Sequence, residues 1–396
     1  MSPSTRPILD TINSSSRFLA LDGLRGAAIL MVLSWNLVSQ MHTEAGSLAA
    51  YAQALCRLNW SGVDLFFVLS GFLIGGILLD QRRSRNLLQV FYLRRACRIF
   101  PIYFLSLILF LIARSCLDGT SHEWGWLLTN QGMGGKGIGT ASPVPLYSYF
   151  LYLQNLWMAW GRSWGPGWLG ITWSLAVEEQ FYLLLPFIIL AVPQKKTLII
   201  LCAVCAACAL FFRMGHEGLS RYCLLPARMD SLMAGVVISC LLRQEGFVLW
   251  LGKSGRAIAA FAIVLAVMFA ALIMRPYALG VLNHSFLAVF YSTVLLGAVM
   301  FPSGAAVRVL EAAPLRWFGR ASYGIYLFHE PVIGAAHAVA FNQAPRIHSP
   351  AEAAVSVAAM LAAIGLAAVS YEWFERHLIA FGKRHAYEMP DSVTAK

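Results

Sequence analysis

The chain has 396 residues, of which 59% are hydrophobic and only 12% are charged, and its formal net charge is +11. Soluble domains carry about 25% charged residues, so this composition excludes an ordinary soluble enzyme. The positive charge does not indicate a nucleic-acid-binding protein, because Lys and Arg lie between apolar runs instead of forming one basic face. The composition therefore predicts an integral membrane protein.

Ten segments are apolar over about 20 residues, the length that an α-helix needs to cross a bilayer. In chain order they are Ala20–Gln40, Gly62–Leu79, Ile99–Leu117, Ile171–Val192, Thr197–Phe212, Leu224–Leu242, Ala257–Met274, Leu279–Phe301, Ser322–Phe341 and Ala353–Phe374. We therefore expect an all-α, polytopic membrane protein. No small-residue cleavage site follows the first apolar stretch, which we expect to be retained as a span and not removed as a signal peptide.

The basic residues predict the orientation of these spans. Most of the 30 Lys and Arg residues fall in loops on the same side as the two termini. The positive-inside rule places that side, and both termini, in the cytoplasm. We expect a cytoplasmic N-terminal tail at 1–17, one transmembrane domain at 18–378 and a cytoplasmic C-terminal tail at 379–396.

The cysteines do not indicate a metal site or a disulfide framework. Cys202, Cys205 and Cys208 have a helical spacing, but no His or carboxylate accompanies them in their apolar run. Cysteine in such surroundings behaves as a small hydrophobic residue, so packing is the favoured interpretation.

The longest external connection, 118–170, contains a Gly-rich stretch, NQGMGGKGIG, and then a cluster of aromatic residues. The aromatic residues are Tyr147, Tyr149, Tyr152, Trp157, Trp160, Trp164 and Trp168. A belt at the membrane interface is the favoured explanation. A surface on which sugar rings or a lipid headgroup stack is the alternative.

The first span, LDGLRGAAILMVLSWN, carries two polar side chains in unusual places. Arg25 and Asn36 are eleven residues apart, which on a helix is about three turns and about 16 Å, so they share one face. An Arg within a span costs about 2.5–3.5 kcal/mol on insertion scales, so we expect a partner or a water-filled cavity. In the alternative interpretation, Arg25 anchors the helix at the inner leaflet and Asn36 packs against a neighbouring helix.

Ionisable side chains recur in the other predicted spans, where they are costly unless they pair or line a cavity. They are Asp64 in the second span, Glu178 and Glu179 in the fourth, Arg228 and Asp230 in the sixth and His329 in the ninth. For most of them the sequence leaves two interpretations open: they form stabilising ion pairs, or they line a functional cavity. A structural role is favoured for Glu179, and His329 is equally consistent with a satisfied core histidine.

The inner loop FYLRRACRIFPIY contains three arginines that a helix would bring together, because Arg94 and Arg98 are four residues apart and Arg95 and Arg98 three. Guanidinium groups bind phosphates bidentately. Positive-inside flanking alone also explains the cluster. With Arg25 on the same side, a cytoplasmic phosphate site is favoured.

These pieces together resemble the membrane-bound acyltransferase family 3, which includes O-antigen, peptidoglycan and nodulation-factor O-acetyltransferases and macrolide acylases. The matching pieces are LDGLRG with a polar residue eleven positions after its Arg, GVDLFFVLSGFLI, RRACRIFPIY, TWSLAVEEQFYLLLPF, RMDSLMAG and ASYGIYLFHEPV. The resemblance covers the chain from Arg17 to about His377.

The resemblance implies ten transmembrane helices around a central cavity for acyl-CoA and an acceptor, in a bacterial inner or plasma membrane. The donor would be cytoplasmic acyl-CoA, acetyl-CoA above all, and the acceptor a hydroxyl of a glycan or small molecule, with no metal. Arg25 and position 36 would be catalytic together with Glu178. Arg95 and Arg98 match the family's RxxR pair and would bind the CoA phosphates with Arg94 and Arg25. Asp64, Trp173, Arg228, Asp230 and His329 would line the cavity.

Position 36 departs from the family pattern, in which a histidine stands there. The attacking hydroxyl must lose a proton, and a general base contributes about 10²–10⁴-fold to such a reaction. Imidazole accepts a proton near neutral pH, whereas the carboxamide of Asn36 does not. The alternatives are an engineered loss of the base, a natural relative with a displaced base and a catalytically inactive relative. The intact surroundings favour the first.

Two other functions fit ten spans with buried charges. One is a transporter or flippase of a lipid-linked sugar or acyl group, and the other is a non-catalytic protein that binds acyl-CoA in the membrane. The sequence lacks the paired Gly- and Pro-broken spans that are typical of inverted-repeat transporters. The acyltransferase interpretation is therefore preferred.

Overall fold

The computed structural model describes residues 15–44, 46–117, 122–129, 143–276, 278–301 and 303–390. Within these ranges the chain is helical and forms no strand, and its single β-bridge joins Met41 to Ile347. The predicted all-α class is confirmed. The Gly-rich NQGMGGKGIG stretch and most of the predicted N-terminal tail lie outside the described residues.

Each predicted span coincides with a long helix. These helices are α2 (Ser15–Ser39), α4 (Gly62–Asp80), α5 (Leu87–Leu117), α9 (Trp173–Ala191), α10 (Lys195–Met214), α12 (Leu225–Leu241), α14 (Gly255–Met274), α15 (Asn283–Met300), α17 (Ala313–Phe341) and α18 (Pro350–Ser370). All of them except α17 belong to segments that are long and apolar enough to cross a membrane. At 29 residues α17 is long enough, but its arginines, histidines and Glu330 make it less apolar.

Shorter helices connect or flank these spans. They are α3 (Leu48–Leu55), α6 (His122–Leu128), α7 (Leu146–Phe150), α8 (Gln154–Gly161), α11 (Gly218–Cys223), α13 (Glu245–Lys253), α16 (Ala305–Leu310) and α19 (Arg376–Arg384). Single 3₁₀ turns precede three of the spans, at Asn59–Ser61, Gly170–Thr172 and Gly280–Leu282. A π-helical turn, Tyr371–Glu375, joins α18 to α19.

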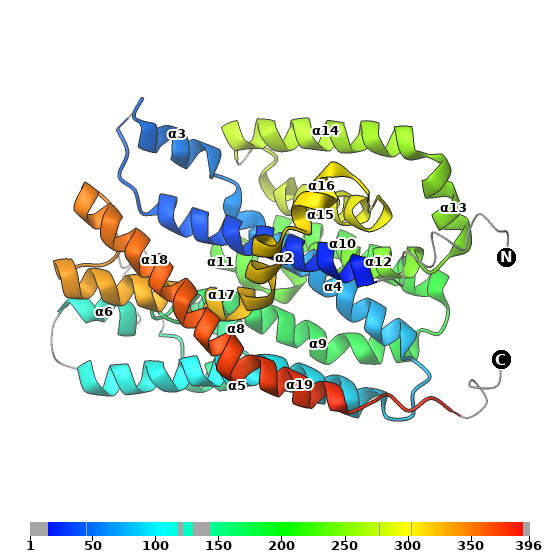
Figure 1. The fold of residues 1–396 in the computed structure, drawn as a ribbon, viewed down its shortest axis with the longest axis horizontal. Coiled ribbons are helices and arrows are strands. Elements are labelled where there is room, and N and C mark those ends of the chain that lie inside the picture. The colour runs from blue at the N-terminus through cyan, green and yellow to red at the C-terminus, as the bar shows by residue number, and fades with distance from the viewer. Residues whose placement is uncertain are drawn as a thin grey trace.

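The long helices form one bundle (Figure 1). Most of them run along the long axis of the molecule, with α14 at one edge and α5 at the opposite edge, and α18 crosses the bundle obliquely. The start of α2 and the end of α19 lie at the same end of the bundle, on the right of the view, while α3 lies at the opposite end. The bundle therefore has two distinct ends, as a membrane-spanning protein requires.

Glycines set the spacing of two central helix pairs. A Cβ atom on Gly26 would overlap a backbone carbonyl of α17, and one on Gly319 would overlap a carbonyl of α2. Gly71 of α4 and Gly235 of α12 face each other's helix in the same way. Small residues at such positions let helix backbones approach closely, which is a principal source of helix association in membranes. The LDGLRG motif thus places Arg25 beside a tightly packed α2–α17 interface.

Candidate functional site

A cavity opens inside the bundle among α2, α4, α5, α9 and α17. Its charged lining consists of Arg25 from α2, Arg95 and Arg98 from α5, and Glu178 from α9. Its empty volume is about 780 Å³ with its opening included. Charged residues from three helices that are far apart in the sequence are thus brought to one site.

The remaining walls of this cavity combine apolar side chains with paired hydroxyls. The apolar part comes mainly from Val63, Phe66, Phe67, Leu69, Leu73 and Ile74 of α4, with Ile99 and Leu175. The Ser70 and Tyr182 hydroxyl oxygens lie 2.6 Å apart, and those of Ser174 and Tyr326 lie 2.8 Å apart. Glu178 is close enough to Arg25 and Arg98 for electrostatic interaction. The cavity can therefore accept a ligand that is anionic in one part and apolar in another.

A second cavity adjoins the first one. Its lining includes Arg94, Arg95 and Arg98 of α5 together with Lys383 and Tyr387, and its empty volume is about 570 Å³ with its opening included. Arg95 and Arg98 line both cavities. Arg94 lines only the second, where its guanidinium donates to the carbonyl of His385 at 2.6 and 3.1 Å. The predicted arginine cluster therefore stands where two cavities meet.

Asn36 contacts a histidine from another helix. Its Nδ2 lies 3.1 Å from Nε2 of His329, and it also donates to the carbonyl of Val32 at 3.1 Å. Nδ1 of His329 lies 2.7 Å from the carbonyl of Tyr326 and 3.2 Å from that of Ile325. Carbonyls only accept, so Nδ1 carries the proton and the lone pair of Nε2 accepts from Asn36. The structure brings these two predicted residues together.

Asn36 and His329 do not line the arginine cavity, although Tyr326, one helical turn before His329, does. His329 is fully buried. Beside it, both carboxylate oxygens of Glu330 are buried without a hydrogen-bond partner among the described residues, and Oε1 is 4.0 Å from Nε2 of His329. The imidazole and the carboxylate form a buried pair next to position 36.

Asp64, Arg228 and Trp173 form a separate buried cluster outside the arginine cavity. Asp64 Oδ1 lies 3.2 Å from Nη1 of Arg228 and accepts a hydrogen bond from the Ser231 hydroxyl at 3.2 Å. The guanidinium of Arg228 lies 5.3 Å from the ring centroid of Trp173 and 4.3 Å from that of Tyr222. An ion pair that is hydrogen-bonded and covered by aromatic rings ties α4 to α12.

Asp230 also forms a buried ion pair outside that cavity. Its Oδ2 lies 2.7 Å from Nη2 of Arg213 and accepts from the Ser285 hydroxyl at 2.9 Å. Arg213 directly follows the predicted span Thr197–Phe212; it lies in the last turn of α10 and is fully buried. The ion pair between Arg213 and Asp230 could not be predicted from the sequence, because the two residues lie on different helices.

The aromatic residues between positions 147 and 168 divide into two groups. Tyr149 and Tyr152 are buried, and Tyr152 stacks on Tyr103 of α5 with ring centroids 4.5 Å apart. Trp160 is 75% exposed and Tyr147 is 54% exposed. Part of the segment is therefore core, and the exposed rings are available to a membrane interface or to a ligand.

Fold and cavity together define a helical, polytopic membrane protein with an arginine-lined cavity inside the bundle. The model of the acyltransferase-domain family, which is the acyltransferase family 3, matches residues 18–371, and the chain belongs to this family. The resemblance seen in the sequence is confirmed. No solved structure matches the chain.

Bacterial O-acetyltransferases are among the similar proteins. The peptidoglycan O-acetyltransferase OatA of Listeria monocytogenes is 27% identical over 346 residues, which cover 79% of this chain and 49% of that protein. The O-acetyltransferase OatA of Staphylococcus aureus is 26% identical over 341 residues, which cover 81% of this chain and 51% of that protein. The chain spans about half the length of these relatives.

Proposed function

We propose that this protein transfers an acyl group, namely acetyl, from cytoplasmic acetyl-CoA to a hydroxyl group of a glycan. The observation that supports this most is the cavity that Arg25, Arg95, Arg98 and Glu178 line together with an apolar wall. An acyl-CoA has the matching chemistry, because it joins several phosphates to a long, less polar arm that ends in a thioester. The O-acetyltransferase names of the relatives support acetyl as the group and a glycan as the acceptor.

Arg95 and Arg98 are the proposed phosphate ligands. Each guanidinium presents several N–H donors in a plane and can bind a phosphate through two parallel hydrogen bonds. Both side chains are half-buried, so water screens their charge less than it would at a fully exposed site. Their place at the junction of two cavities lets them hold phosphates while the rest of the donor extends into the bundle.

The reaction requires one proton to move. The acceptor oxygen attacks the thioester carbonyl carbon, the C–S bond breaks, and the departing thiolate receives a proton while the hydroxyl loses one. Arg25 is the proposed stabiliser of the negative charge that develops during this step, since a fixed cation in a water-poor site lowers the transition-state energy. Glu178, beside Arg25, is the proposed partner that orients it.

The proton acceptor is the unusual part of this proposal. By the sequence resemblance, Asn36 takes the place of a histidine of the family. It cannot take a proton, so the present chain is proposed to be an impaired form of the enzyme. His329 supplies the imidazole nitrogen that touches Asn36 at 3.1 Å. It is the proposed source of whatever base catalysis this form retains, with Glu330 as the counter-charge for the imidazolium.

Thiol release from acetyl-CoA by the purified chain in lipid nanodiscs, with a glycan acceptor present, tests the function. We expect acceptor-dependent thiol release that Arg25→Ala lowers by about 10²-fold, the scale of losing one charge-stabilising group. Lys253→Ala, which removes an exposed cation far from the cavity, is the control and should not change the rate. Movement of a lipid-linked sugar or acyl group across the membrane without thiol release would instead identify a transporter or flippase. Acyl-CoA binding without either activity would identify a binding protein.

A further inference from the structure

The second cavity has a wall that lies beyond the family domain. The family match ends at residue 371, whereas Ile379, Lys383 and Tyr387 line this cavity opposite Arg94, Arg95 and Arg98. The segment that carries these three residues was expected to be a cytoplasmic tail. It consists of α19 and the residues that follow it to position 390.

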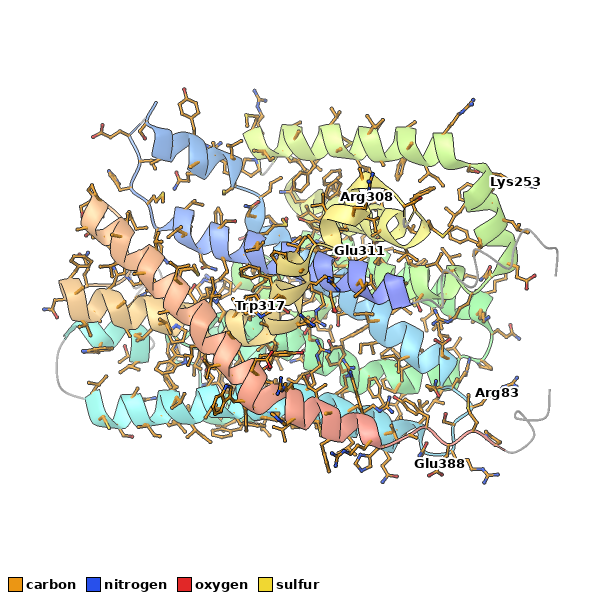
Figure 2. All side chains as sticks on the ribbon, viewed as in Figure 1. Arg83, Lys253, Arg308, Glu311, Trp317 and Glu388 are labelled. Carbon is orange, nitrogen blue, oxygen red and sulfur yellow. The ribbon has the colours of Figure 1, made fainter. Side chains whose placement is uncertain are left out.

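Hydrogen bonds hold this C-terminal segment against the start of α5 and the turn before it. The Glu388 carbonyl accepts from the backbone N–H of Arg85 at 2.9 Å, and the Glu388 N–H donates to Oδ1 of Asn86 at 2.9 Å. Nδ2 of Asn86 donates to the carbonyl of Ala386 at 3.1 Å. Figure 2 shows Glu388 and Arg83 at the same end of the bundle. The segment is therefore held in place by hydrogen bonds and forms one wall of the second cavity.

Two side chains of this wall have the chemistry of a nucleotide site. Lys383 is exposed and adds a cation to the arginine cluster. Tyr387 is half-buried, and the guanidinium of Arg94 lies 4.7 Å from its ring centroid, which fixes the ring. Burial raises the pKa of Tyr387 above its ordinary value, so its hydroxyl stays protonated at neutral pH and can donate a hydrogen bond.

We propose that Lys383 and Tyr387 bind the nucleotide end of the acyl-CoA, with Lys383 on a phosphate that belongs to the nucleotide and Tyr387 against the adenosine. This proposal rests on the proposed function and extends it, because it assigns the donor's nucleotide to the second cavity and its arm to the first. Arg95 and Arg98, which line both cavities, hold the pyrophosphate between them. The phosphate of an anionic lipid headgroup shares this chemistry and is the competing source of ligand.

Calorimetry on the full chain in nanodiscs with two ligands tests the proposal. Acetyl-CoA carries the nucleotide, whereas S-acetyl phosphopantetheine has the same arm and thioester without it. We expect Lys383→Ala and Tyr387→Leu each to weaken acetyl-CoA binding by about tenfold and to leave S-acetyl phosphopantetheine binding unchanged. Lys383→Arg should retain most of the affinity. Arg384→Ala, which removes the neighbouring exposed cation outside the cavity lining, is the matched control and should have no effect.

The outcomes separate this proposal from the function on which it rests. Unchanged acetyl-CoA affinity in both variants overturns the nucleotide assignment and leaves the proposed function standing. Equal losses for both ligands also overturn it, because they indicate a structural effect of the wall. Variants that lose phosphatidylglycerol in native mass spectrometry but keep acetyl-CoA show a lipid site and overturn it. No binding of acetyl-CoA to the unmodified chain overturns both proposals.

Discussion

At the scale of single residues, the side chain at position 36 determines how efficient the proposed acyl transfer is. A carboxamide can hold an imidazole by a hydrogen bond, as Asn36 holds His329, but it cannot take a proton itself. Nε2 of His329 keeps a lone pair because Nδ1 donates to backbone carbonyls. The present chain therefore has an oriented imidazole beside position 36 and none at it.

Asn36→His should raise thiol release from acetyl-CoA by about 10²-fold or more, because it places a general base on the face of α2 that carries Arg25. Acceptor-dependent thiol release by the purified variants measures this. Asn36→Ala is the control and should give no gain. His329→Gln should lower the rate of the present chain more than it lowers the rate of the Asn36→His form. Equal rates with Asn and His at position 36 would contradict the proposed role of this position.

Arg98→Ala should weaken acyl-CoA binding by about tenfold, or 1.4 kcal/mol. The reason is the loss of a charge-assisted contact to phosphate, and Arg95→Ala should have a similar effect. Calorimetry with acetyl-CoA in nanodiscs measures the change. Raising the salt concentration should reduce the difference in dissociation constant between the variants and the unmodified chain. An unchanged dissociation constant in both variants would remove the arginine pair from the donor site.

At the scale of helices, the buried ion pairs explain how α4, α10 and α12 keep one arrangement in the bundle. Asp64 and Arg228 join α4 to α12, and Arg213 and Asp230 join α10 to α12. The α4–α12 interface also contains the close backbone approach at Gly71 and Gly235. Several residues that resembled cavity groups in the sequence thus serve helix packing in the structure.

Asp64→Ala should destabilise the folded protein by about 3–5 kcal/mol, because it leaves the buried guanidinium of Arg228 without its counter-charge. Thermal unfolding in detergent, followed by circular dichroism, measures the loss. Replacing both partners with apolar residues, as in the pair Asp64→Leu and Arg228→Met, should recover part of the stability. If Asp64→Ala melts at the same temperature as the unmodified chain, the pair does not stabilise the bundle.

At the scale of the whole molecule, several basic residues lie toward one end of the bundle. Lys253, Arg83 and Glu388 lie toward the same end in Figure 2, and the second cavity with its arginines and Lys383 is formed where α5 begins and α19 ends. Tyr51 of α3 is exposed, and α3 lies at the opposite end. In the proposed orientation this end faces the cytoplasm, as the positive-inside rule predicts.

Cysteine labelling tests this orientation in a chain whose own cysteines are replaced by serine. In intact cells a membrane-impermeant maleimide should label Tyr51→Cys but should not label Lys253→Cys or Glu388→Cys. A permeant maleimide should label all three, which controls for accessibility. The reverse pattern would place the donor cavity outside and would exclude cytoplasmic acyl-CoA as its ligand.

Much of the fold could be predicted from composition and hydropathy, because a bilayer forces each apolar stretch to satisfy its backbone hydrogen bonds as a helix. The ten predicted spans all coincide with long helices for this reason. Arg95 and Arg98 share one cavity as their three-residue spacing predicts. Lys383 and Tyr387 had no such signal, since they follow the last span and resemble an ordinary basic tail.

The sequence by itself determined that this is a helical membrane protein and which residue types its interior would carry. Only the tertiary structure decided which of those residues line the cavity, which form ion pairs and which contact one another. Glu178 joins Arg25 in a cavity, Asp64 joins Arg228 in an ion pair, and His329 lies against Asn36. The physical reason is that hydropathy and helical period act along one helix, whereas the partner of a buried charge is chosen by the packing of helices that are distant in the chain.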